Sequence, residues 1–246
     1  MSAVDQSVFG PWRIYGRQIQ KELCAESRFC VNRLKLLYDR SMPFYRDKIY
    51  PHLVTAFGNP LSIRKIRQQV VPLAKGNVLE IGLGSGANVP CYDSATVTKL
   101  YALEPNPGMI RLAELELNKT ELNFEFLDLS GEQIPLDNES MDTVVSTFTL
   151  CTISGVEDAL RGIGRVLKPG GKLIFFELGS SPDPDVRRWQ RMFEPIAHRA
   201  YEGLSLTRDI PSLITQSGFH MEHLEAGYIA KFPKSWTYCF WGNAIH

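Results

Sequence analysis

Three glycines at alternate positions follow a short apolar run that contains an acid, and these residues point most clearly to chemistry. The run is residues 78–81, Val-Leu-Glu-Ile, and the glycines are Gly82, Gly84 and Gly86. Continuous apolar runs of this kind are typical of buried parallel strands. Glycines after such a strand let the backbone turn sharply and approach a ligand closely, because a Cβ atom would block the approach. We expect a helix to follow, with its first N–H groups toward a polar ligand, and therefore a nucleotide-type site.

The glycine spacing alone fits two nucleotides. Gly82-x-Gly84-x-Gly86 is typical of enzymes that use S-adenosylmethionine (SAM). Gly82-x-Gly84-x-x-Ala87 also satisfies the fingerprint of dinucleotide-binding proteins. Glu104 supplies the acid that both kinds of site place about twenty residues further on. A chance glycine-rich turn is the third interpretation, which the agreement of strand, glycines and acid disfavours.

Features outside the glycines favour SAM over NAD. Glu80 stands at the end of the apolar run, where a carboxylate can face the ammonium group that SAM carries and NAD lacks. A short-chain dehydrogenase would need Tyr-x-x-x-Lys, and none of the nine tyrosines has a Lys four residues later. An NAD(P)-linked reductase therefore stays the alternative from another enzyme class.

The elements that must position these groups can be read along the chain. Short apolar or β-branched runs alternate with stretches of helical spacing from residue 77 to residue 178. This alternation predicts a parallel sheet with right-handed crossovers. After the run at 77–81 we expect strands at 99–104, 123–127, 141–148 and 172–178, and helices at 62–71, after Pro107 and at 154–167.

The last third of the chain predicts the edge of the sheet. A segment rich in Pro, Arg and aromatic residues between 182 and 201 interrupts the alternation. Thr207 then looks like the N-cap of a helix that ends at Gly218. Strands at 220–226 and 235–245 would form a hairpin, so one strand runs antiparallel. The expected fold is an α/β, Rossmann-like, seven-stranded and mostly parallel sheet with an antiparallel C-terminal strand.

Several blocks resemble the class I SAM-dependent methyltransferases over roughly residues 38–246. Residues 80–86 match their first motif, residues 103–106 their second, and residues 165–171 the turn before strand five. Within this superfamily the chain is similar to the membrane-associated thiol methyltransferase family (methyltransferase type 11) and its bacterial relatives. That finer resemblance rests on Gly86-Ala87-Asn88, Pro105-Asn106-Pro107, Leu150-Cys151 and the block from Pro195 to Arg208.

The resemblance implies a SAM site, with S-adenosylhomocysteine (SAH) as the product. Where many relatives have Asp-Ala-Glu, this chain has Ser130-Gly131-Glu132, so the adenine contact usually made by that Asp must come from elsewhere, such as Asp128 or a backbone N–H. The residues implied are Glu80, Gly82, Gly84 and Gly86 for the methionine part, Glu104 for the ribose, Asn106, Met109, Ser130, Gly131 and Glu132 for the adenine, Thr147 for the sulfonium and Tyr38 as a lid.

Methyl transfer from a sulfonium is an in-line displacement with an activated donor, so the chain has mainly to align the acceptor and exclude water. We expect a small apolar acceptor, with a thiol favoured because it loses its proton with modest help. His198 is the candidate base, and a structural histidine is its alternative reading. Quinone or phospholipid methylation and a non-catalytic SAM-binding protein stay open. Without an Asn-Pro-Pro-Tyr motif after the fourth strand, we expect no nucleic-acid substrate.

Charge divides the chain into two parts. Residues 1–75 hold 13 Lys/Arg and 5 Asp/Glu, whereas residues 76–246 hold 14 and 22. We predict a helical N-terminal extension or lid over 1–75 and a methyltransferase domain over 76–246. The basic, aromatic extension predicts a peripheral, salt-sensitive contact with anionic membranes, and a solvated helical face is the alternative. Five scattered cysteines without C-x-x-C spacing indicate a cytoplasmic chain with no zinc site.

Overall fold

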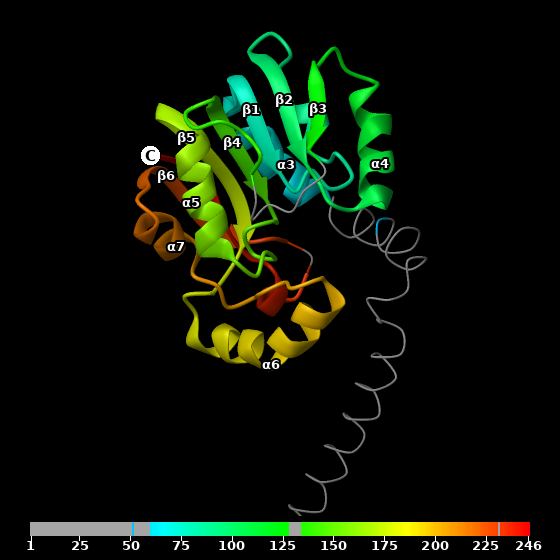
Figure 1. Ribbon diagram of the computed structural model, residues 1–246. Helices are drawn as coiled ribbons and strands as arrows, with labels where there is room; N and C mark the ends of the chain where they lie inside the picture. The colour runs from blue at the N-terminus through cyan, green and yellow to red at the C-terminus, as the bar shows by residue number, and fades with distance from the viewer. Residues whose placement is uncertain (1–50, 52–59, 128–133, 231) are drawn as a thin grey trace, which may run out of the picture. The chain divides into compact units, whose positions relative to one another are not determined.

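The computed structural model describes Pro51 and residues 60–127, 134–230 and 232–246 (Figure 1). These residues all lie in the second of two compact units into which the chain divides, Phe44–His246. The predicted domain boundary after residue 75 stays a prediction. The extension that was predicted to be helical lies mostly outside the described residues, apart from its last helix.

The described residues form a seven-stranded sheet in the order β3-β2-β1-β4-β5-β7-β6. The pairs from β3 to β5 are parallel, and β7 runs antiparallel to both of its neighbours. This confirms the predicted fold class and its single antiparallel strand. The strands are β1 Gly76–Ile81, β2 Val97–Leu103, β3 Phe124–Leu127, β4 Met141–Thr147, β5 Leu167–Leu178, β6 His220–Tyr228 and β7 Tyr238–Ile245.

Helices cover both faces of the sheet (Figure 1). Alternate residues of β5 show this, because Leu173 and Phe175 pack into one core while Ile174 and Phe176 pack into the other. A strand buried on both faces must be apolar throughout, which is why β1, β4 and β5 were recognisable. One core includes α5 and α7, and the other includes α3 and α4. The α-helices are α3 Leu61–Val70, α4 Pro107–Leu117, α5 Val156–Val166, α6 Pro184–Ala200 and α7 Ile210–Gln216, with 3₁₀ turns η3 Val71–Leu73, η4 Val89–Cys91 and η5 Lys234–Trp236.

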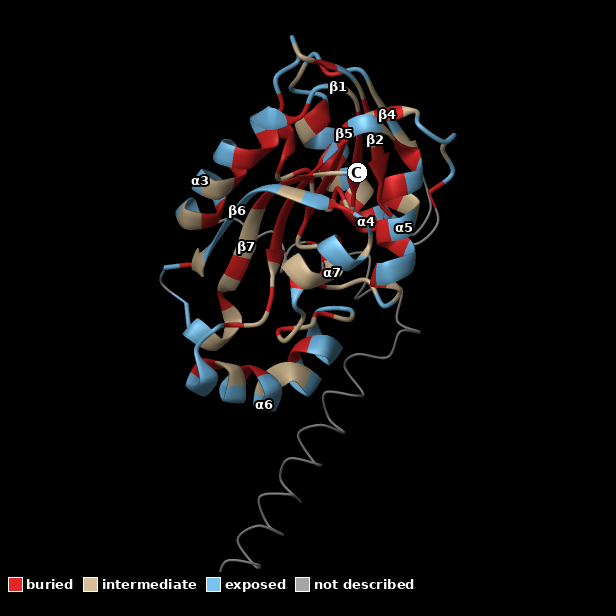
Figure 2. Ribbon diagram, turned by 90° about the vertical axis from the view of Figure 1, so that its left-hand side faces the viewer, coloured by how far each residue is buried: buried red, intermediate tan, exposed pale blue. Residues whose placement is uncertain are grey.

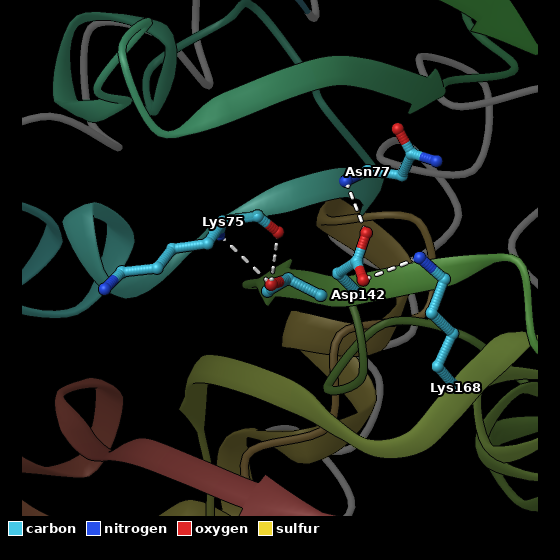
Figure 3. Close-up of polar contacts among 5 residues, drawn as sticks. Lys75, Asn77, Asp142 and Lys168 are labelled. Atoms are coloured by element: carbon cyan, nitrogen blue, oxygen red, sulfur yellow. Dashed lines mark hydrogen bonds and ion pairs between the residues drawn. The ribbon is translucent and has the colours of Figure 1, made fainter.

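Hydrogen bonds of one carboxylate join the beginnings of three strands (Figure 3). Asp142 of β4 accepts hydrogen bonds from the Asn77 N–H of β1 at 2.8 Å and from the Lys168 ammonium of β5 at 2.7 Å. Burial alone would raise the pKa of Asp142, but these two donors lower it below its ordinary value. Asp142 therefore joins the beginnings of β1, β4 and β5.

Two expectations about helices were wrong, and one helix was not predicted. No α-helix follows the glycine turn, because Pro90 has no N–H to donate to the Gly86 carbonyl; Val89 donates to it instead, and a 3₁₀ turn forms. The Pro-rich segment after residue 182, for which no element was predicted, is the 17-residue helix α6, which has Pro184 in its first turn, where a missing N–H costs little. The N-cap of α7 is Asp209, whose carboxylate accepts from the Ser212 N–H, and not Thr207.

Candidate functional site

The glycine turn after β1 is built from left-handed backbone. The φ angles of Gly82, Gly84 and Gly86 are +69°, +59° and +80°, values that side chains disfavour. A Cβ atom on Gly82 would collide with the Thr149 side chain, and one on Gly86 would lie 3.1 Å from the backbone of α4. At Gly84 the nearest atom would be the Gly82 carbonyl oxygen at 3.9 Å. Gly82 and Gly86 thus serve the packing of the turn, whereas Gly84 faces space that the described residues leave open.

Glu80 is buried beneath this turn, with 1% of its surface exposed. Its carboxylate accepts a hydrogen bond from the Asn88 amide at 2.7 Å and another from the Tyr92 hydroxyl at 2.6 Å. Burial raises the pKa of Glu80 to about 7, and these hydrogen bonds oppose the rise. Each carboxylate oxygen retains a lone pair, so Glu80 both holds the turn and can accept a ligand donor.

Arg67 reaches into the same place from α3. Its Nη1 donates to the Asn88 amide oxygen and, at 2.8 Å, to the Thr147 hydroxyl. Its side chain is buried, and burial lowers the pKa of its guanidinium while the Glu80 carboxylate opposes that shift. The Arg67 Nε–H has no hydrogen-bond partner among the described residues. We call Arg67, Glu80, Asn88, Tyr92 and Thr147 the buried polar cluster.

Glu104, at the end of β2, fastens the other side of the turn. Its carboxylate accepts from the Gly84 N–H at 2.8 Å and from the Asn106 N–H at 2.9 Å. Asn106 is the N-cap of α4, and its side chain accepts from the N–H groups of Gly108 and Met109. Glu104, Asn106 and Met109 are all buried. The two acids predicted to hold SAM therefore flank the glycine turn from adjacent strands.

The end of β4 brings an aromatic ring to the cluster. Phe148 follows Thr147 and has a φ of +55°, a conformation that is rare and strained for a bulky residue. Its ring centroid lies 4.6 Å from that of Phe176 and 5.5 Å from the Arg67 guanidinium carbon. A strained backbone with an aromatic side chain beside buried polar groups is typical of a functional site.

Glu177, at the end of β5, organises the loop that follows β4. It is fully buried and accepts from the Ser146 hydroxyl at 2.7 Å. It also accepts from three successive backbone N–H groups, those of residues 149–151, each at 3.1 Å. Burial raises the pKa of Glu177, and these donors oppose the rise. With both oxygens engaged by the fold, Glu177 positions the loop.

Aromatic residues of α6 and η5 lie at the edge of the sheet where the parallel strands end, since α6 follows the end of β5 (Figure 1). The ring of Trp236 is 6.1 Å, between centroids, from each of Phe193 and Tyr201. His198, the candidate base, is in the last turn of α6, and its side chain is exposed. Its assignment as a base stays a prediction.

Sequence reasoning missed three members of the buried polar cluster: Arg67, Asn88 and Tyr92. Asn88 and Tyr92 follow the glycines closely, and their hydrogen-bonding side chains could have drawn attention. Arg67 had no local signal, because it meets its partners only when α3 packs on the sheet. The predicted residues Tyr38, Ser130, Gly131 and Glu132 lie outside the described residues.

Comparison with known proteins agrees with this geometry. A family model described as a methyltransferase domain matches residues 79–175. The thiol S-methyltransferase TMT1A of Homo sapiens is 30% identical over 83% of this chain and 78% of its own length. TMT1B of Rattus norvegicus is 35% identical over 60% of this chain and 62% of its own. A demethylmenaquinone methyltransferase of Clavibacter sepedonicus is 29% identical over 48% of each chain.

A solved structure has the same fold. The N-methyltransferase NodS of Bradyrhizobium japonicum, in complex with SAH, superimposes with a TM-score of 0.58 at 17% identity, over 78% of this chain and 90% of that one. The fold and site define a class I SAM-dependent methyltransferase. The chain belongs to the family of the thiol S-methyltransferases TMT1A and TMT1B.

Because the chain belongs to this family, its cofactor is SAM. The alternative interpretation, an NAD(P)-linked reductase, is therefore wrong. The described residues suit such a ligand, because Gly84 faces open space and the buried Arg67 keeps an unused N–H donor. No helix in the described part of the chain is both long and apolar enough to span a membrane.

Proposed function

We propose that this chain transfers a methyl group from SAM to a small apolar thiol at the carboxyl ends of β1, β2 and β4. The observation that carries the proposal is the direct contact between the buried polar cluster and Phe148. A site for methyl transfer has to bring a polar methyl donor, SAM, together with an apolar methyl acceptor. The relatives named thiol S-methyltransferases support a thiol as the acceptor.

The buried residues suit the separate parts of the donor. Glu80 can accept from the ammonium group, and Arg67 has a donor for the carboxylate at the same end of the molecule. Glu104, on the neighbouring strand, can accept from the ribose hydroxyls, and it already fixes the Gly84 N–H. Gly84 lets the backbone pass close to the ligand because no side chain intervenes.

Bound SAM supplies a methyl group that is already activated, so the chain's own residues have mainly to bind, orient and exclude water. A thiol has an ordinary pKa of about 8.5 and needs only modest help to lose its proton near neutral pH. An alcohol would need a strong base. We place the acceptor beside Phe148, with Thr147 at the methyl group, and no carboxylate base is required.

The direct test is methyl transfer from labelled SAM by the purified full chain. The acceptors are an alkyl thiol, the alcohol of the same carbon skeleton, a demethylated quinol and phosphatidylethanolamine. We expect transfer to the thiol with one SAH formed per methyl group, and none to the alcohol. Transfer only to a non-thiol acceptor would overturn the choice of a thiol.

A quinol is the second candidate acceptor, because a demethylmenaquinone methyltransferase is among the relatives. The same aromatic surroundings would suit an apolar quinol ring. The quinol in the panel separates the two: turnover of the quinol with the thiol left unmodified would support this alternative.

His198 has its own test. A general base contributes typically 10²- to 10⁴-fold to the rate, so His198→Gln should lower thiol methylation at least a hundredfold if this residue takes the proton. The control is His220→Gln, an exposed histidine at the start of β6. A loss of less than about threefold would make His198 a surface residue and leave the alignment mechanism sufficient.

A further inference from the structure

Helix α6 has an outward strip of large apolar side chains. Trp189, Met192 and Ile196 are 53%, 54% and 50% exposed, far above the usual value for such residues. They lie at i, i+3 and i+7, so they form one line along a helix about 25 Å long. Figure 2 shows the exposed side of α6 turned away from the body. We call these three residues the α6 apolar strip.

Arginines run beside this strip. Arg188 and Arg199 are both exposed and, at four before and seven after Met192, lie on the same side of α6. Arg191, also exposed, lies further round the helix. No ion pair to these three arginines occurs within the described residues. Asp185, also exposed, lies on the same side, seven residues before Met192, and offsets one of these charges. The helix still carries net positive charge next to apolar surface, although residues 76–246 as a whole hold 14 Lys/Arg against 22 Asp/Glu.

The inward face of α6 is anchored by polar side chains. The Gln190 side chain accepts from the Ser181 N–H at 2.9 Å and donates to the Gly179 carbonyl at 3.0 Å. Glu194 accepts from the Ser205 hydroxyl and, at 2.7 Å, from the Leu206 N–H. The apolar strip is thus presented by a fixed helix.

We infer that α6 is a membrane-docking surface, whose partner is an anionic lipid bilayer. Trp, Met and Ile can enter the boundary between headgroups and acyl chains, and the arginines beside them meet acidic headgroups. A convex helix face suits a flat bilayer. The chain's own residues 1–59 fit this face poorly, because they hold nine Lys/Arg against five Asp/Glu and would be repelled by its arginines.

This surface does not depend on the identity of the acceptor. It lies at the edge of the sheet where the parallel strands end, so docking there would bring that edge toward the bilayer (Figure 1). An apolar acceptor dissolved in the bilayer would then have a short path to the site.

The test is sedimentation of the purified full chain with vesicles of phosphatidylcholine alone or with 30% phosphatidylglycerol. The apolar variant is Trp189→Ser/Met192→Ser/Ile196→Ser, and the charge variant is Arg188→Gln/Arg199→Gln. Matched controls elsewhere are Leu115→Ser, 59% exposed on α4, and Arg64→Gln/Lys65→Gln, both exposed on α3. SAH affinity and Tm check that each variant is folded.

We expect the wild-type chain to bind the anionic vesicles more strongly at low salt, with binding that falls as salt rises. The apolar variant should lose at least tenfold in partitioning to both vesicles. The charge variant should lose about fivefold per arginine, and only with the anionic lipid. Brominated lipid should quench tryptophan fluorescence less in Trp189→Phe than in the wild-type chain.

Three results would overturn the inference. The wild-type chain could fail to bind anionic vesicles at 50 mM salt. The apolar variant could bind as well as the wild-type chain, which would place any membrane contact in residues 1–59 or elsewhere. A wild-type dimer that the apolar variant abolishes would make the strip an interface between two copies.

Discussion

Glu80 is buried, and we propose that it binds the ammonium group of the ligand, so a change in its protonation should be measurable. Its pKa in the folded chain is about 7, against an ordinary 4.5. The folded state therefore holds a proton between these values that the unfolded state has lost. The stability contributed by this group is fully present below pH 4.5 and falls, by roughly 3 kcal/mol at most, as pH rises to about 7.

Binding of SAH should have the opposite dependence on pH. If the ligand's ammonium group pairs with the Glu80 carboxylate, binding releases the proton, and the Kd should rise by up to about tenfold for each pH unit below 7. Calorimetry between pH 5 and 8, in two buffers of different ionisation enthalpy, measures this directly. In Glu80→Gln the slope should vanish and affinity should be low throughout. An equal slope in Glu80→Gln would assign the proton to another group.

Gly84 offers a variant that separates ligand contact from backbone strain. Gly84→Ala should cost about 1–2 kcal/mol of stability because of its left-handed φ, yet its Cβ would touch no atom of the described chain closely. We expect SAH affinity to fall at least tenfold, since the new methyl group would point into the ligand's space. Thermal denaturation and calorimetry check the two effects.

Gly170 provides the matched control for this experiment. It also has a positive φ, +75°, and a Cβ there would meet no atom of the described residues within 4 Å, but it lies within β5, near the start of that strand. Gly170→Ala should lose similar stability and keep full SAH affinity. If both variants bind SAH equally well, Gly84 does not face the ligand.

At the scale of elements, Glu177 fixes the conformation of the loop after β4. Glu177→Gln replaces one acceptor oxygen with an NH₂ group that faces a backbone N–H donor of residues 149–151. Losing a buried, charge-assisted hydrogen bond costs roughly 1.5–3 kcal/mol. For a chain of this size that lowers the Tm by roughly 3–10 °C. Glu121→Gln, at an exposed position, should leave the Tm unchanged in the same calorimetric scan.

Elements whose physical signal is local were predictable from the sequence. The strands β1, β4 and β5 are apolar on both faces because both faces are covered, and this shows directly as continuous runs. The break at the glycine turn follows from the conformational freedom of glycine. The turn expected at 168–171 is instead part of β5, at an irregularity in its pairing with β4. Strand bounds differed by a few residues, as for β2, which begins at Val97 rather than Lys99.

Features that arise only in the folded chain were missed. Helix α6 was missed because prolines usually break helices. Pro184 is in its first turn, where proline is compatible with a helix, and Pro195 lies inside it. Asp209 rather than Thr207 starts α7, and both were plausible N-caps. The buried polar cluster depends on Arg67 meeting Asn88 and Thr147, 21 and 80 residues away along the chain. No spacing rule could predict that meeting.

At the scale of the whole molecule, the donor site and the α6 apolar strip share one edge of the sheet. The strands β1, β2 and β4 end there with the polar groups that we propose to bind SAM, and α6 follows the end of β5. An apolar acceptor could enter from the side of α6 while SAM is held over the strand ends. Methylation of a long-chain thiol should therefore gain more from added anionic vesicles than methylation of a short, water-soluble thiol.

Ligand binding should stabilise the whole domain, because the cluster joins α3, β1, β4 and the glycine turn. SAH at 100 times its Kd adds about 2.7 kcal/mol to the free energy of unfolding, which raises the Tm by roughly 5–10 °C. The scan is best made at pH 8, where Glu80 is ionised. NADH at the same concentration should give no shift, and Gly84→Ala should respond to SAH only at much higher concentration. An equal shift in Tm with NADH would mean that the pocket recognises only the adenosine part that the two ligands share. Glu80 and Arg67 would then not bind the amino acid part of SAH.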